Sequence, residues 1–63
     1  MNFSKNLVTC MQNKKITDYK LAKLIGVHPS TIKNWKDGAV PSLELAVKVA
    51  KALSVPLDSL INE

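Results

Sequence analysis

Polar side chains that can hydrogen-bond recur between positions 30 and 34 of the chain. A helix turns about 100° per residue, so Ile32 and Trp35 would lie about 60° apart and define a buried side. Ser30 and Asn34 would then lie on the opposite side, with Lys33 at its flank. An asparagine amide can pair with adenine, a lysine ammonium with guanine or a phosphate, and a serine hydroxyl with several bases. This outer face is either ordinary solvated surface or, within a helix-turn-helix, the face that contacts base edges in a DNA major groove.

Two helices joined by a short turn are expected to position this face. The first begins after Thr17, a good N-cap, and ends at Gly26, which tolerates left-handed backbone. The second begins after His28, because Pro29 suits the first helical position and keeps the preceding residue extended. It ends near Lys36, before a turn signal at positions 37 and 38. This is the arrangement of a helix-turn-helix, in which Pro29 also offers an apolar surface to a thymine methyl group.

Three further helices are expected around this pair, and no strand. One runs from Phe3 to Lys14 and lacks a closing glycine, so a lysine or an asparagine must form the turn. Another begins at Ser42 and has an apolar face formed by Leu45, Ala46, Val49 and Leu53. A last helical turn begins at Pro56 and carries Leu57, Leu60 and Ile61.

Length and composition restrict the function as well as the architecture. The 63 residues allow one domain, residues 1–63, and leave little chain for an enzyme pocket. The net charge is +4, from nine lysines, no arginine and five acidic residues, which suits a nucleic acid as partner. One cysteine excludes an internal disulfide and a Cys/His metal cluster, and no apolar run is long enough to cross a membrane. We therefore expect a basic cytoplasmic domain without a cofactor, a metal or an enzymatic activity.

The segment from Thr17 to Gly38 resembles the DNA-binding motif of the lambda-repressor and Cro family. The matching residues are Leu21-Ala22, Gly26-Val27, Ile32, Trp35 and Gly38. The resemblance continues through Pro41-Ser42, the stretch at 50–53, Val55-Pro56-Leu57 and Leu60. It implies an all-α fold of five helices, in which the second and third form the helix-turn-helix.

The resemblance also implies which residues hold the DNA backbone. The family's backbone-contacting positions correspond here to Thr17, Thr31, Lys36, Gly38 and Ala39. Asp18 also corresponds to one of them, but its charge would repel a phosphate. The residues themselves add Lys20 and His28 near these places. They also add Tyr19, for which two roles are open: its hydroxyl contacts a phosphate, or its ring covers the core.

One departure from the family concerns an ion pair. The family often joins an arginine of the first helix to a glutamate just after the recognition helix, and the matching positions here are Met11 and Lys36. Both partners are changed together, so no unpaired buried charge is left. The stem of Lys36 would pack at the edge of the core, with its ammonium either in solvent or pointing at DNA.

A subunit interface is expected near the C-terminus. Leu57, Leu60 and Ile61 either cap the core or contact a second copy, and Val40 could join such an interface. The family generally dimerises through its C-terminal part, and a two-fold dimer places two recognition helices about 34 Å apart. We therefore expect a homodimer on DNA.

The sequence predicts a sequence-specific regulator of transcription, of bacterial or phage origin, that occupies a double-stranded operator as a repressor does. The length suits a stand-alone Cro-like protein and also the N-terminal domain of a longer repressor. No small-molecule ligand is indicated. The alternative is a protein-interaction module, such as an antitoxin whose main partner is a protein.

Overall fold

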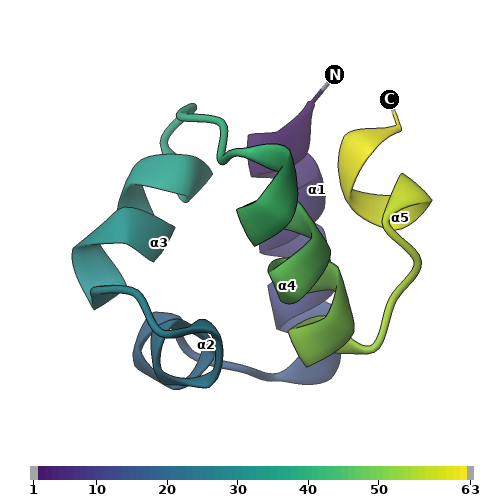
Figure 1. Ribbon diagram of the computed structural model, residues 1–63. Coiled ribbons are helices and arrows are strands. Elements are labelled where there is room, and N and C mark those ends of the chain that lie inside the picture. The colour runs from purple at the N-terminus through teal and green to yellow at the C-terminus, as the bar shows by residue number, and fades with distance from the viewer. Residues whose placement is uncertain (1, 63) are drawn as a thin grey trace.

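The computed structural model describes residues 2–62, which form five helices in the predicted order (Figure 1). Their bounds are α1 Phe3–Lys14, α2 Asp18–Ile25, α3 Pro29–Lys36, α4 Leu43–Leu53 and α5 Asp58–Ile61. Within these residues no strand is present, so the predicted all-α class is confirmed. The predicted domain limits, residues 1 and 63, lie outside the described residues.

Local chemistry explains where the helices begin. Thr17 and Ser42 each accept a hydrogen bond at their side-chain oxygen, from the backbone N–H of Lys20 and Leu45 respectively. Such bonds satisfy donors that a helix leaves unpaired in its first turn. The N-cap of α3 is His28, whose extended backbone precedes a proline at the start of the helix. The predicted starts of these three helices are therefore confirmed.

Left-handed residues end three of the helices. Gly26 closes α2 with a φ of 80°, as predicted for that glycine. After α1, Lys15 has a φ of 54°, so a lysine does form the turn that lacks a glycine. Ser54 ends α4 in the same conformation, with a φ of 56°.

A single apolar cluster joins the helices. α1 packs against α3, α4 and α5, and α2 packs against α3 and α4. Trp35 is buried, as predicted, and meets the ring of Phe3 edge to face with 6.1 Å between centroids. The buried cluster consists of Phe3, Leu7, Met11, Leu21, Ala22, Ile25, Ile32, Trp35, Ala46, Val49, Ala50, Leu53 and Leu60. The face of α3 that the sequence assigned to the core is thus the buried one.

The position of α5 decides between the two alternatives that the sequence left open for Leu60. Leu60 is 0% exposed, so it belongs to the core and has no surface to offer a second copy. Asn6 on α1 holds α5 in this position, because its side-chain amide donates to the carbonyl oxygens of Leu60, at 2.9 Å, and of Asn62. These carbonyls lie at the end of α5, where the helix supplies no partner. Leu57 and Ile61, by contrast, are only partly buried.

Candidate nucleic-acid interface

The turn between α2 and α3 fixes the direction of the second helix. The backbone N–H groups of Gly26 and Val27 both donate to the carbonyl of Ala22, at 2.8 and 3.0 Å. Three residues, 26–28, therefore suffice to connect the helices, and the apolar faces of both turn toward the core. Ile32 and Trp35 anchor α3 there, which leaves its opposite face to solvent.

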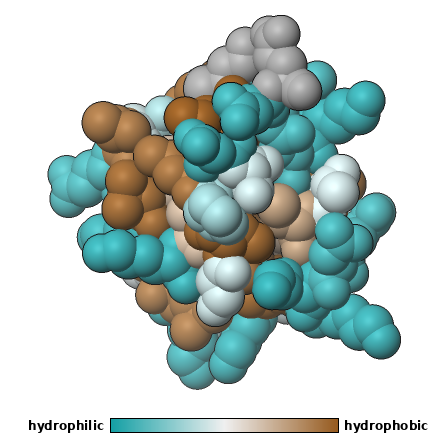
Figure 2. All heavy atoms as spheres, turned by 90° about the vertical axis from the view of Figure 1, so that its right-hand side faces the viewer, coloured by the Kyte–Doolittle hydropathy of each residue, from teal (hydrophilic) through white to brown (hydrophobic). Residues whose placement is uncertain are grey.

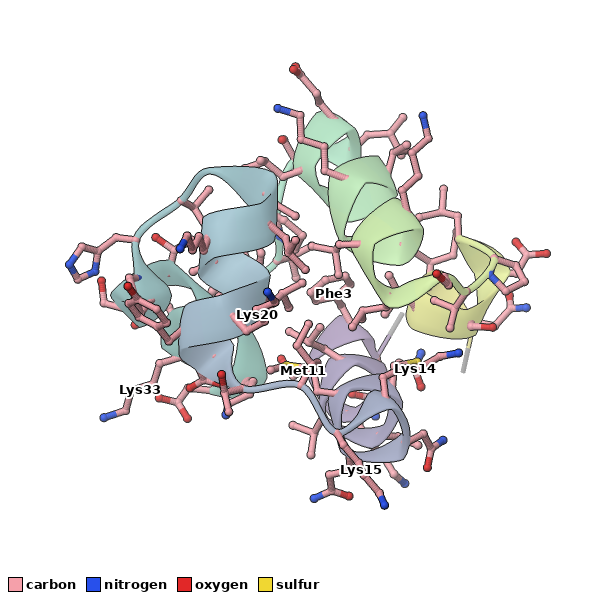
Figure 3. All side chains as sticks on the ribbon, turned by 90° about the horizontal axis from the view of Figure 1, so that it is seen from below. Phe3, Met11, Lys14, Lys15, Lys20 and Lys33 are labelled. Carbon is pink, nitrogen blue, oxygen red and sulfur yellow. The ribbon has the colours of Figure 1, made fainter. Side chains whose placement is uncertain are left out.

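The predicted base-reading residues lie on that free face. Lys33 and Asn34 are exposed, and the Lys33 side chain projects away from the body of the domain (Figure 3). Ser30 is exposed as well, whereas Pro29 is half-buried. The structure therefore brings three of the four predicted residues to one open surface of α3. An α-helix with such a surface fits the width of a DNA major groove.

Ser30 and His28 are linked to each other at the start of α3. The His28 Nδ1 accepts from the backbone N–H of Ser30 at 3.1 Å, and the Ser30 hydroxyl lies 2.8 Å from the same nitrogen. Because Nδ1 is the acceptor, the proton of a neutral imidazole lies on Nε2, where it can be donated outward. His28 therefore caps the helix and still has one free donor. The hydroxyl of Ser30 donates to this nitrogen, and its oxygen can still accept a hydrogen bond from a base.

Most of the residues predicted to contact the DNA backbone are exposed. Thr17, Tyr19, Lys20 and His28 are exposed, as are Gly38 and Ala39, while Thr31 is half-buried. Tyr19 is 67% exposed, so its ring does not serve the core. The N–H groups of Gly38 and Ala39 already donate to the carbonyls of Trp35 and Asn34, at 3.3 and 3.0 Å. Both N–H groups thus have an acceptor within the chain, and the phosphate contacts predicted for these two residues stay predictions.

An ion pair joins the two helices at Lys36. Its Nζ lies 2.7 Å from the Asp18 carboxylate, and both side chains are about one-third exposed, at 31% and 33%. Asp18 was not predicted as a partner of Lys36, and the predicted contact of Lys36 with DNA stays a prediction. The family position in α1 is occupied by the buried Met11, so the pair links α3 to α2 instead of to α1. The opposite charges of Asp18 and Lys36 are the signal in the sequence that these two side chains could meet.

This ion pair changes the electrostatics of the site. Asp18 occupies the first turn of α2, where a carboxylate is favourable but would repel a nearby phosphate. The ammonium of Lys36 compensates that charge at hydrogen-bonding distance. A DNA backbone near the start of α2 therefore meets a neutral pair instead of an isolated carboxylate.

Residues 2–62 also bear on two other kinds of site. No three His, Cys, Asp or Glu side chains come together there as a metal site would require. No helix in that part of the chain has the length and apolar character needed to cross a membrane.

The chain matches a known protein family. The family described as "Helix-turn-helix" matches residues 9–60, which include all of α2, α3 and α4. No curated protein and no solved structure shows significant similarity to the chain. The matched residues cover most of the chain and contain the two helices whose geometry is described above. The chain therefore belongs to the lambda-repressor and Cro type of helix-turn-helix family, a family of DNA-binding regulators.

Proposed function

We propose that this protein is a sequence-specific regulator of transcription that binds a double-stranded operator through the exposed face of α3. One observation carries the proposal: Lys33 and Asn34 are exposed on a helix whose other side, Ile32 and Trp35, is anchored in the core. Anchoring fixes the direction of the polar groups, and fixed hydrogen-bonding groups are what base readout requires. The protein acts in the cytoplasm of a bacterium or of a phage-infected cell, as a repressor.

The roles divide between base edges and backbone. Asn34 reads adenine, Lys33 reads guanine or a phosphate, and Ser30 and Pro29 add a hydroxyl and an apolar contact. The chain has no arginine, so the commonest bidentate guanine reader is absent and DNA shape contributes to specificity. Phosphates are held by Thr17, Tyr19, Lys20, His28 and Thr31. Lys36 contributes by neutralising Asp18, and Gly38 and Ala39 by allowing close approach.

The proposed active form is a homodimer on DNA. Val40 is 57% exposed, and Leu57 and Ile61 are partly buried, so these three remain the proposed interface after Leu60 is assigned to the core. Figure 2 shows the side of the molecule that carries α5, where apolar surface is divided by hydrophilic side chains. Because the apolar area is not continuous, we expect the two subunits to associate weakly by themselves and more strongly when both bind the same DNA. The domain measures 26 × 21 × 20 Å, which is compatible with two recognition helices about 34 Å apart.

Ultracentrifugation tests the dimer. Val40→Asp introduces a charge at an exposed position, so it should reduce the cooperativity of operator binding without unfolding the domain. Lys48→Asp on α4 is the control, because it adds an aspartate at an exposed position that borders α2. Unchanged stoichiometry and cooperativity of the Val40 variant on operator DNA would contradict the interface.

Selection of bound fragments from random DNA tests the function itself. We expect a recovered site with two related half-sites about 10 base pairs apart. A salt series with that site should show affinity that falls steeply, with a slope of about −0.9 for each phosphate contacted. No enriched sequence, together with salt-independent binding of a protein partner, would favour the protein-interaction alternative.

A further inference from the structure

A groove lies between α2 and α4, on the side of α2 that faces away from α3. α2 packs against α3 and against α4, whereas α3 and α4 do not pack against each other. One part of the groove is an open hollow of about 440 Å³ lined by Leu24, Ile25, Lys48, Lys51 and Ala52. The groove is therefore separated from the face of α3 that carries Lys33 and Asn34.

A second hollow continues the groove beyond Ala52, which lines both. It has a volume of about 420 Å³ and is lined by Lys14, Lys15, Ile16, Thr17, Lys20, Ala52, Leu53 and Ser54. In Figure 3, Lys14 and Lys15 lie at the α1 end of the domain and Lys20 lies on α2, while Lys33 projects from the other side. We call the two hollows together the lysine-rimmed groove.

The charges and the floor of this groove are complementary to one kind of partner. Every charged residue that lines it is a lysine, and these five are more than half of the chain's nine. Its floor is apolar. Leu24 lies outside the buried cluster and is 53% exposed. A large apolar side chain surrounded by ammonium groups suits an apolar stripe flanked by carboxylates.

We propose that the lysine-rimmed groove binds an acidic amphipathic helix of a partner protein. Such a helix would place its apolar side chains on Leu24, Ile16 and Ala52 and its carboxylates beside the lysines, as in other helix-in-groove complexes. A nucleic acid would use the lysines but would leave the apolar floor without a partner. Leu24, Lys48 and Lys51 lie outside the proposed DNA contacts, so the partner would be recruited to DNA through this part of the groove. Thr17 and Lys20, at the other end of the groove, would be shared with the DNA backbone. This inference goes beyond the proposed operator binding.

The probe is a fluorescent synthetic helix of about 16 residues, roughly four turns, with leucines at i, i+3, i+4 and i+7 and glutamates elsewhere. A peptide of the same composition in scrambled order is its control. We expect the amphipathic peptide to bind with a Kd below about 1 mM and the scrambled peptide more weakly. Amide NMR shifts should change at Leu24, Ile25 and Ala52 but not at Lys33 or Asn34.

Two pairs of variants locate the site. Leu24→Asp and Lys51→Glu should each weaken the peptide at least about fivefold, a change of about 1 kcal/mol. Leu43→Asp and Lys5→Glu are the matched controls, because Leu43 is an exposed leucine and Lys5 an exposed lysine outside the groove. Circular dichroism and unchanged operator binding of all four variants establish that the fold is retained.

Several results would overturn the proposal. The first is that the peptide shows no saturable binding. The second is that the control variants weaken the peptide as much as the groove variants do, and the third is that the NMR shifts map to α3. A further contradicting result is displacement of the peptide by double-stranded DNA in the wild type but not in Lys51→Glu, which would make the groove a nucleic-acid surface. Operator binding that fails in the wild type while the peptide still binds would contradict the proposed function and leave this inference standing.

Discussion

Replacing Lys36 by methionine tests the ion pair between α3 and α2. Methionine keeps most of the apolar stem and removes the ammonium that lies 2.7 Å from Asp18. Exposed pairs contribute about 0–1 kcal/mol, and this one is only about one-third exposed at each end, so we expect a loss in the upper half of that range, about 0.5–1 kcal/mol. Asp18→Asn and the double variant complete a cycle whose coupling energy should have the same size.

Urea unfolding at low salt and at about 1 M salt measures this coupling, which should nearly vanish at the higher ionic strength because partly exposed charges are screened. Lys5→Met, at an exposed position of α1, is the control for loss of a surface lysine. Additive effects of the two single changes at low salt would refute the pair as a stabilising contact.

The same variants distinguish two roles for Lys36 in DNA binding. If Lys36 neutralises Asp18, Lys36→Met weakens binding because the carboxylate is left to repel phosphate, and Asp18→Asn restores it. If Lys36 contacts a phosphate, the loss remains in the double variant and the salt slope falls by about 1. The second outcome would contradict the neutralising role.

Three further predictions concern the fold. Leu60→Ala should lower the free energy of unfolding by about 2–5 kcal/mol in a urea titration, because the side chain is fully buried; a loss below about 1 kcal/mol would contradict its place in the core. Asn6→Ala should accelerate hydrogen exchange in α5 and leave α2 and α3 unchanged, since it removes the amide that holds the α5 carbonyls; equal protection of α5 would refute this anchoring. Gly38→Ala should destabilise the domain by about 1–2 kcal/mol through its φ of 124° alone, because a Cβ there meets open space; thermal unfolding without any loss would contradict the strain.

The helix boundaries could be predicted because short-range chemistry determines them. Thr17, Gly26, Pro29 and Ser42 act on backbone groups only a few residues away, and all four lie where the sequence places them. The buried side of α3 follows equally from helical spacing, since Ile32 and Trp35 together fix the rotation of the helix.

Features that depend on distant residues could not be predicted in the same way. Leu60 is buried because Asn6, 54 residues earlier, holds α5 against α1, and no local pattern reveals that contact. The partner of Lys36 likewise depends on how α2 and α3 cross. The predicted base-reading and phosphate contacts remain predictions, because they require DNA.

Binding of Asn34→Ala to two DNA duplexes tests the central claim most directly. Fluorescence anisotropy would compare the operator recovered by selection with an unrelated sequence of the same length, at one salt concentration. We expect about 5- to 150-fold weaker operator binding, which corresponds to the roughly 1–3 kcal/mol of a good base contact, and nearly unchanged binding to the unrelated DNA. Asn13→Ala, at an exposed asparagine of α1, should alter neither. Equal loss on both duplexes, or no loss on the operator, would contradict base readout by the exposed face of α3.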